Sequence, residues 1–322
     1  MVPEVAAGSL DYVLGRLPAV LPFLLMTVLR GYLQAARLTR AIVVSSIVAN
    51  VFNFVADWIL IYGDEGLRQL GLPEVGIEPL GVFGVGMASS MAAYLQLGIM
   101  SLGLRTAPKP AGVSRSISWP LQGEMFRLGF PVGLQFLAEV GVFAAVQVIM
   151  GGLGTLAVAA HQVAIMLASL TFSVCVGVGA ATSVQVGRAV GARDRARVRA
   201  AGLAGLVLGV GFMACTAVAM WLLPTQLARL MTTETRVIEL AAVLLVIAGF
   251  FQIVDGIQAV GAGILRGAGR TREAFIANFV GHWFIGMPIA LFLCFGVDMG
   301  PAGLWWGLTS GLAVVAVALS WE

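Results

Sequence analysis

The stretch LRGYLQAARLTRAIVVSSIVANVFNFVADWILIYG, residues 29–63, joins a basic segment to a long apolar run. The run at 41–62 is long enough to cross a bilayer as a helix, because a hydrocarbon core of ~30 Å needs about 20 mostly apolar residues. It nevertheless carries Asn50, Asn53 and Asp57. A carboxylate in such a run predicts that one face of the helix meets protein or water rather than lipid.

The amino-acid composition extends this interpretation to the whole chain of 322 residues. Hydrophobic residues make up 59%, charged residues 11%, and the mean hydropathy is +0.97, whereas charged residues reach about 25% in soluble domains. We therefore predict an all-α polytopic membrane protein. The apolar runs predict nine transmembrane helices, at about residues 10–29, 41–62, 82–104, 128–150, 156–186, 200–222, 237–262, 274–296 and 302–320.

The basic residues indicate how the chain is oriented. Fifteen of the 19 Lys and Arg residues follow the first, third, fifth and seventh spans, at 30–40, 105–127, 188–199 and 266–272. Because cytoplasmic loops are enriched in Lys and Arg, we expect these segments inside the cell and residue 1 outside. The prediction is a multi-pass protein of the bacterial inner membrane. The basic residues then need no nucleic-acid partner to explain them, and the three cysteines lack the close spacing of a metal site.

A repeated order of motifs divides the chain into two parts. LRGYLQAARLTR at 29–40 and LRGAGRTRE at 265–273 each lead into an apolar span, an outside loop and a helix that opens with Gly-x-x-Gly. Parallel repeats are typical of transporters with two halves. We predict a partial N-terminal lobe of three spans at 1–104, a cytoplasmic linker at 105–127 and a complete lobe of six spans at 128–322. We also expect three further helices before residue 1.

Together these motifs resemble the multidrug and toxic compound extrusion (MATE) family, in particular its DinF-like bacterial and archaeal branch. The resemblance covers the whole chain and includes AAHQVA at 159–164, GVGAATSVQVGRAVGARD at 177–194 and DGIQAVGAGILRGAGRT at 255–271. It implies twelve helices in two bundles that export organic cations or amphipathic drugs in exchange for protons or sodium ions. It also implies a monomer in membrane lipid, with no cofactor besides the coupling ion. This sequence departs from the family pattern, because the first three of the twelve helices are expected before residue 1.

Acidic residues inside the predicted spans are the strongest candidates for chemistry. An ionised group at mid-bilayer costs about 2.5–3.5 kcal/mol on insertion scales, so each one requires water or polar partners. A carboxylate flanked by amides can hold either a proton or a sodium ion. Amides lie on the same helix face as each acid, one turn away. These groups are Asn53 with Asp57, Gln135 with Glu139, and Gln252 and Gln258 with Asp255.

The resemblance assigns roles to these residues. It implies that Tyr12, Asn53 and Asp57 belong to an ion-linked hydrogen-bond network in the first lobe, and that Glu139 and Asp255 form the acidic pair of the second. The alternative for each acid is a structural hydrogen bond to a neighbouring helix, and for His161 a packed neutral ring. Flat or flexible side chains such as Phe23 and Met26 could line a promiscuous drug cavity. The polar candidates for that cavity are Asn50, Gln135, Gln252, Gln258, His161 and Gln162.

Two other classes of function stay open from the residues alone. A lipid-linked oligosaccharide flippase of the same superfamily would need cationic residues in its cavity to hold a pyrophosphate. The predicted spans offer acids instead, and the arginines fall in loops. An intramembrane aspartyl protease would need Asp57 and Asp255 as a dyad with oxygens about 3 Å apart. The repeat places these two acids in different lobes, so we expect no enzyme activity.

Overall fold

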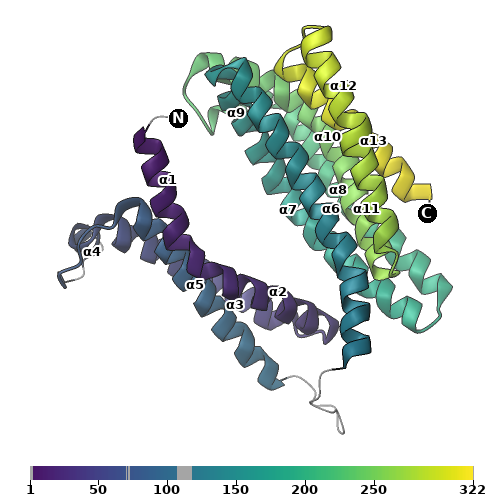
Figure 1. Cartoon of the computed structure of the whole chain (residues 1–322), viewed down its shortest axis with the longest axis horizontal. Coiled ribbons are helices and arrows are strands. Elements are labelled where there is room, and N and C mark those ends of the chain that lie inside the picture. The colour runs from purple at the N-terminus through teal and green to yellow at the C-terminus, as the bar shows by residue number, and fades with distance from the viewer. Residues whose placement is uncertain (1–2, 70, 72, 107–117, 322) are drawn as a thin grey trace. The chain divides into compact units, whose positions relative to one another are not determined.

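The computed structural model describes residues 3–69, 71, 73–106 and 118–321, and all of its regular structure is helical (Figure 1). Within these residues nine helical segments are long and apolar enough to cross a membrane, which confirms the predicted fold class and number of spans. The segments cover Gly8–Ala35, Thr39–Tyr62, Gly81–Gly103, Trp119–Leu153, Thr155–Gly191, Arg195–Leu222, Thr235–Gly267, Thr271–Gly296 and Pro301–Trp321.

The chain forms two compact units, Met1–Arg115 and Ser116–Glu322. The predicted linker at 105–127 overlaps the boundary between them, and its residues 107–117, with Lys109 and Arg115, lie outside the described residues. From Trp119 onwards this segment is helical, because α6 (Trp119–Leu153) begins well before the span predicted at 128. Pro120 lies in the first turn of α6, where its missing amide hydrogen breaks no helical hydrogen bond.

The first unit contains three spans among its described residues, and the first of them is broken. Its elements are α1 (Pro3–Arg16), η1 (Leu17–Ala19), α2 (Val20–Ala35), α3 (Thr39–Tyr62), α4 (Asp64–Gln69), α5 (Gly81–Gly103) and η2 (Leu104–Thr106). A 3₁₀ turn, η1, separates α1 from α2 at Pro18, which has no amide hydrogen to continue the helix. α5 packs against both α3 and α1.

Small residues bring α1 and α5 close together. A Cβ atom added to Gly15 would lie 2.5 Å from the carbonyl oxygen of Phe83, and one added to Gly86 would lie 2.5 Å from that of Tyr12. The Ser90 hydroxyl donates a hydrogen bond of 2.8 Å to the carbonyl oxygen of Gly15. Close backbone approach through small residues is a common way for membrane helices to associate. It fixes the position of Tyr12 relative to α5.

The loop between α4 and α5 is tied to Asp64, the first residue of α4. The Asp64 carboxylate accepts backbone N–H hydrogen bonds from Val75, Gly76 and Ile77 at 3.0–3.1 Å. These bonds stabilise the charged carboxylate and lower the pKa of Asp64 below its ordinary value, with the Ile77 amide as the largest cause. One carboxylate therefore organises the loop.

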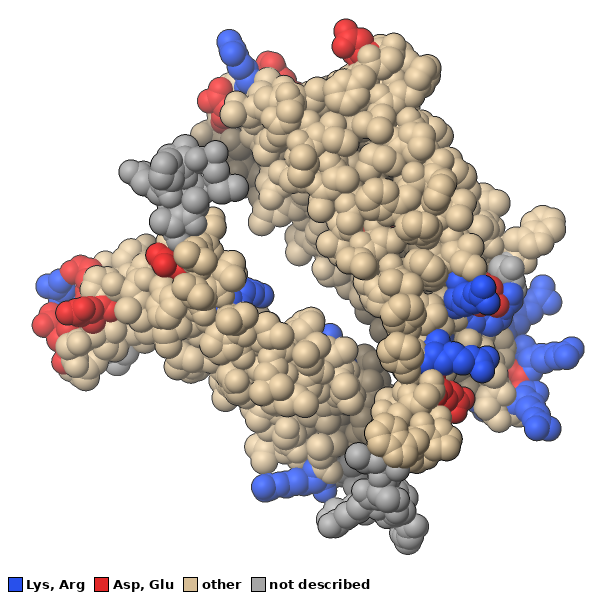
Figure 2. Space-filling model, viewed as in Figure 1, with Lys and Arg blue, Asp and Glu red and all other residues tan. Residues whose placement is uncertain are grey.

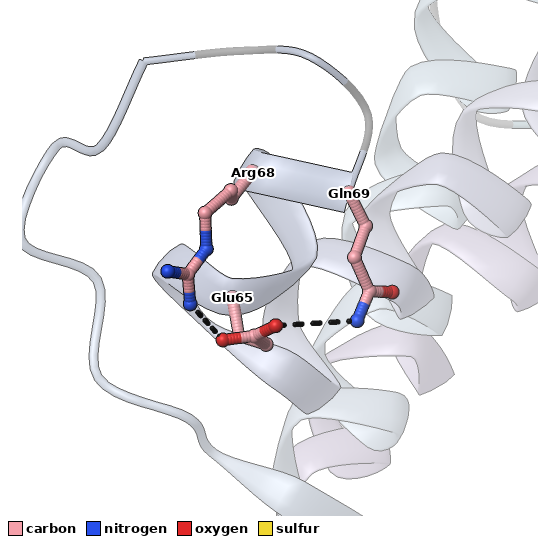
Figure 3. Close-up of polar contacts among 3 residues, drawn as sticks. All are labelled: Glu65, Arg68 and Gln69. Carbon is pink, nitrogen blue, oxygen red and sulfur yellow. Dashed lines mark hydrogen bonds and ion pairs between the residues drawn. The ribbon is translucent and has the colours of Figure 1, made fainter.

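A surface ion pair lies on α4. Figure 3 shows the Glu65 carboxylate accepting hydrogen bonds from Arg68 and from the Gln69 amide. The side chains of Glu65 and Arg68 are both more than half exposed. Exposed pairs of this kind contribute only about 0–1 kcal/mol to stability. Glu65 is therefore an acid of the first unit whose charge can be removed with little effect on the fold.

The second unit contains six spans within residues 118–321. Its further elements are α7 (Thr155–Gly191), α8 (Arg195–Leu222), α9 (Pro224–Arg229), α10 (Thr235–Gly267), α11 (Thr271–Phe279), η3 (Val280–Gly286), α12 (Met287–Leu291), η4 (Phe292–Gly296) and α13 (Pro301–Trp321). α10 packs against α7, α8 and α13, and α6 packs against α11 (Figure 1). The core around α10 includes the fully buried Leu244, Leu245 and Trp305. Two π-helical segments, η3 and η4, interrupt the eighth span.

Glycines determine how closely α7 and α10 pack. A Cβ atom added to Gly263 would lie 2.5 Å from the carbonyl oxygen of Gly179, and one added to Gly267 would lie 2.4 Å from that of Ser183. Real Cβ atoms do not approach other atoms this closely, so the two backbones touch directly. On α7 the contact accounts for Gly179 and Gly187, where an added Cβ atom would lie 2.9 Å from the carbonyl oxygen of Ala259 and 3.2 Å from that of Gly267.

The two basic turns of the predicted repeat have the same backbone geometry. Arg37 (φ 63°), after α2, and Gly269 (φ 78°), after α10, both adopt the left-handed conformation. In each turn the next amide donates a hydrogen bond of 2.8 Å to a leucine carbonyl, that of Leu33 in the first and Leu265 in the second. This is the Schellman arrangement that ends a helix.

The helices that follow these turns match as well. A Cβ atom added to Gly84, near the start of α5, would lie 2.7 Å from the carbonyl oxygen of Leu60. One added to Gly303, near the start of α13, would lie 2.8 Å from the carbonyl oxygen of Leu293. The Gly-x-x-Gly opening thus has the same packing role in both copies, which supports the parallel repeat.

On the surface of the second unit drawn in Figure 2, charged side chains gather at the ends. On the face drawn in Figure 2, most of its positive side chains lie around one end, over the turns between α7 and α8 and between α10 and α11. The long flank between the ends is free of charge in this view. The basic segments 188–199 and 266–272 therefore lie at the same end of the second unit, as their assignment to one side of the membrane requires.

Candidate ion and substrate sites

Asp57 lies on α3 inside a membrane span, one turn after Asn53. Both side chains are partly buried. Asp57 Oδ1 and Asn53 Nδ2 are fully buried and have no hydrogen-bond partner. Buried polar atoms are nearly always paired, so each of these two requires an explanation. A proton or a metal cation would satisfy the carboxylate oxygen.

A pocket of about 650 Å³ lies among α1, α2, α3 and α5 of the first unit. Asn50 and Asn53 line it, as do Phe23 and Met26. Asp57 is not among the lining residues, although the resemblance implied a place in the same network. Asn53 therefore lines the drug-sized pocket and also lies one turn before Asp57 on α3.

Tyr12 also lies away from the lining of this pocket. Its hydroxyl accepts a hydrogen bond of 2.6 Å from the Arg16 guanidinium, which also lies 5.7 Å from the centre of the Tyr12 ring. Tyr12 therefore holds Arg16, and no hydrogen bond between Tyr12 and Asn53 or Asp57 is present.

Sequence reasoning missed three polar residues of this pocket. Arg16, Ser89 and Gln96 all line it. The expectation that arginines stay in loops is therefore wrong for Arg16, which lies where the first span breaks at η1. The proline that breaks the helix two residues later was the available signal, because a break inside a span creates room for a polar side chain. Gln96 is linked to α3, since its amide donates a 3.0 Å hydrogen bond to the Ser46 hydroxyl.

The second unit brings Glu139 of α6 together with α10. Glu139 interacts with the side chain of Gln258, and Asp255 is near enough to interact electrostatically with Glu139. Glu139, Gln135 and Gln258 line a cavity of about 40 Å³. Gln135 and Gln258 are only 2% exposed, and their Oε1 atoms have no hydrogen-bond partner. Two orphaned amide oxygens and the Glu139 carboxylate thus belong to the lining, with Asp255 nearby, and oxygen donors of this kind suit a small cation.

Arg266 is the second exception to the expectation about arginines. It lies inside the α10 span, lines the same cavity and interacts electrostatically with Glu139. Its guanidinium lies 5.5 Å from the centre of the Phe136 ring, and its Nε atom is buried without a partner. α10 is longer than the span predicted to end at 262, which is why the sequence assigned this residue to a loop.

The remaining predicted cavity residues do not join either site. Gln252 is fully buried, and its amide donates a hydrogen bond to the Thr171 hydroxyl of α7. His161 is buried with its ring packed edge-on against Trp305 at 5.8 Å, and its Nδ1 atom is buried without a hydrogen-bond partner. Gln162, the next residue on α7, has an exposed side chain.

No cluster of three or more His, Cys, Asp or Glu side chains suited to a transition metal occurs in the part of the chain that the structure describes. Glu139 instead has the side chains of Gln135 and Gln258 beside it in the cavity lining. Carboxylate and amide oxygens suit hard cations such as Na⁺, and the acid can also hold a proton. Asp57 lies in the first unit and Asp255 in the second.

Comparisons of sequence and of fold both match this chain to MATE proteins. The MatE family matches residues 131–292. The chain is 37% identical to "Probable multidrug resistance protein NorM" of Brucella suis and 35% identical to the protein of that name in Rhizobium meliloti, over 99% of this chain and 68% of each relative. The eukaryotic MATE transporter AtDTX14 superimposes with a TM-score of 0.81 at 24% identity, over 96% of this chain and 67% of that one. The Vibrio cholerae MATE transporter VcmN in its bent form gives 0.77 at 21% identity, over the same shares.

The two structural likenesses concern the fold alone at these identities. They bear out the two-bundle transporter type of fold that the resemblance implied. With nine helices long and apolar enough to cross a membrane among the described residues, and with bacterial relatives, the chain is a multi-pass protein of the inner membrane.

Proposed function

Because the chain belongs to the MatE family, whose solved structures are membrane transporters, we propose that it exports organic cations or other amphipathic drugs in exchange for protons or sodium ions. Its relatives are named multidrug resistance proteins, which supports a drug as the cargo. Those relatives carry the name NorM, so the DinF-like branch stays a prediction.

The observation that carries the proposal is the orphaned pair of Asp57 and Asn53. A carboxylate oxygen and an amide nitrogen are buried in one membrane span without partners. Leaving such groups unpaired is unfavourable, so the pair is expected to bind and release a small ligand rather than to stabilise the helix. A proton or Na⁺ on Asp57 satisfies the carboxylate, and its release restores a negative charge inside the membrane.

The second-unit cavity provides a further place for the coupling cation. Glu139 supplies negative charge from the lining and Asp255 from nearby, and Gln135 and Gln258 supply two neutral oxygens. At about 40 Å³ the cavity has room for one ion or one water molecule rather than a drug. Binding there stabilises whichever conformation of the transporter forms the cavity, which is how an ion gradient shifts an equilibrium between two states.

The first-unit pocket is the place proposed for the drug. Its volume of about 650 Å³ lies within the range of drug-sized sites, about 300–1,000 Å³. Phe23 and Met26 provide flat and flexible apolar contact, and Asn50, Asn53 and Gln96 provide hydrogen bonds that do not require a particular charge. Such a lining accepts varied amphipathic compounds.

Arg16 favours a second candidate, a flippase of lipid-linked oligosaccharides. It is the only charged residue among the described residues that line this pocket, and a guanidinium suits a phosphate group. The two candidates predict opposite effects of Arg16→Gln: drug export would be kept or improved, whereas transport of a pyrophosphate-linked lipid would be lost.

The proposal is tested with the purified chain in proteoliposomes that contain a fluorescent organic cation. Efflux is measured with an imposed proton gradient, an imposed sodium gradient, or neither. We expect one of the two gradients to accelerate efflux and its collapse to stop it. Efflux that proceeds at the same rate without any gradient would contradict ion coupling, and no efflux above that of empty vesicles would contradict drug export by this chain.

A further inference from the structure

We propose that the turn between α7 and α8 binds the phosphate group of an anionic phospholipid. The turn forms a concavity of about 530 Å³ lined by Arg193, Arg195 and Arg199, with Asp194 among them. α7 and α8 are both membrane spans, so the turn that joins them lies at the bilayer surface, where headgroups are. This inference does not depend on transport and is separate from the proposed function.

The charge of the concavity is positive. Among the described residues, Arg193, Arg195 and Arg199 form no ion pair. Asp194 is already engaged, because its carboxylate accepts the Arg197 backbone N–H at 3.0 Å and pairs with the Arg197 guanidinium at 3.6 Å. Figure 2 shows positive side chains projecting from this end of the second unit. The acid therefore caps α8 and leaves three guanidinium groups for an anion.

The backbone of the turn holds Arg193 in a strained conformation, as the turn after α2 holds Arg37. Its φ of 56° is left-handed, a conformation that is unfavourable for residues with a Cβ atom. The corresponding turn after α10 has Gly269 at this position, which avoids that strain. Arg193 thus occupies a place where glycine would fit better, and its side chain lines the concavity.

The surface next to the concavity fits a lipid better than free phosphate. Leu203 and Val207 follow Arg199 at intervals of four along α8, which places all three on one helix face. Leu203 and Val207 are 62% and 64% exposed. A cationic group at the bilayer surface with an apolar stripe running below it matches the charged head and the acyl chain of a phospholipid. Guanidinium groups also bind phosphate oxygens in pairs of hydrogen bonds, which a surface lysine cannot do.

The test compares two double variants of the full chain. R195Q/R199Q removes two charges from the concavity. R229Q/R236Q removes two exposed arginines that lie elsewhere in the second unit, near α9 and the start of α10, and serves as the matched control. Each protein is placed in nanodiscs of phosphatidylcholine with phosphatidylglycerol, and retained phosphatidylglycerol is counted by native mass spectrometry. A labelled phosphatidylglycerol then gives the affinity.

We expect R195Q/R199Q to weaken phosphatidylglycerol binding by about 30-fold, from two surface cations acting together, and the control to leave it unchanged. R195K/R199K should restore part of the loss. Equal losses in both double variants would mean non-specific charge attraction and would overturn the proposal, as would no loss in either. Inorganic phosphate is added as a competitor. Full displacement of phosphatidylglycerol by phosphate at equal concentration would mean that the ligand is a soluble phosphate and would overturn the lipid assignment.

Discussion

Gln258 of α10 and Glu139 of α6 line the same cavity of about 40 Å³, and their side chains interact. Gln135 adds a second buried amide oxygen, and Asp255 adds a second negative charge nearby. Most of the other residues that line the cavity are apolar, such as Phe136, Phe172 and Val176. An oxygen-lined cavity in such surroundings is expected to discriminate a small cation from larger ligands.

The first prediction concerns the charge of Asp255. Asp255→Asn keeps the shape of this 6% exposed side chain and removes its charge. Sodium affinity of the detergent-purified protein should fall by about tenfold or more, because at least one favourable charge interaction is lost. Radiolabelled sodium binding measures it. Asp298→Asn is the control, since Asp298 is exposed and asparagine tolerates its left-handed backbone. Unchanged sodium affinity in Asp255→Asn would exclude Asp255 from the site.

Removal of the Arg266 charge is predicted to change sodium affinity in the opposite direction. Its positive charge interacts with Glu139 and so opposes a cation in the cavity. Arg266→Gln should therefore raise sodium affinity, by roughly tenfold for one charge interaction in a partly buried site. The same binding assay measures the change. A fall in affinity in a variant that still folds would show that Arg266 orients Glu139 instead of competing with the ion.

The close contact of α7 and α10 predicts the effect of a single methyl group. Gly263→Ala places a Cβ atom 2.5 Å from the carbonyl oxygen of Gly179, so the helices must separate. We expect a destabilisation of about 1–3 kcal/mol and a lower melting temperature in detergent. Gly211→Ala on α8 is the control, because a Cβ atom there meets nothing within 4 Å. It should be neutral or slightly stabilising. Equal melting temperatures for both variants would contradict the packing described for α10.

The loop held by Asp64 predicts a pH dependence. The pKa of Asp64 lies below its ordinary value of 3.8, so the stabilisation of the loop is fully present above pH 3.8 and is lost as the pH falls through the lowered pKa. Carboxyl ¹³C NMR of labelled aspartate should give a midpoint for Asp64 below 3.8. In Asp64→Asn, the amides of Val75, Gly76 and Ile77 should exchange faster near neutral pH. A midpoint at or above the ordinary value would mean that these amides do not bind the carboxylate.

Much of the fold could be predicted because membrane helices leave long apolar runs in a sequence. The positions at which the spans are interrupted were harder to predict. Pro18 signals the break at η1, but the π-helical segments Val280–Gly286 and Phe292–Gly296 leave no comparable signal, since a π-turn inserts a residue without changing the apolar character of the run. The early start of α6 was also missed, because the helix continues past the apolar run that fits the bilayer.

The amide neighbours of the acids were predicted through helical spacing, which works within one helix only. The spacing correctly groups Asn53 with Asp57 and Gln135 with Glu139 on common faces. It does not reveal which helix each face meets. Gln162 is exposed although its neighbour His161 is buried. Arg266 lines a cavity, which its position near the end of a helix did not indicate.

The central claim is that Asp57 carries the coupling ion, and one transport measurement tests it most directly. Asp57→Asn and the control Glu65→Gln each remove one negative charge from the first unit, the second from an exposed ion pair on α4. Gradient-driven efflux of a fluorescent organic cation from proteoliposomes should fall to that of empty vesicles in Asp57→Asn and stay unchanged in Glu65→Gln. Full gradient-driven efflux in Asp57→Asn would contradict the account.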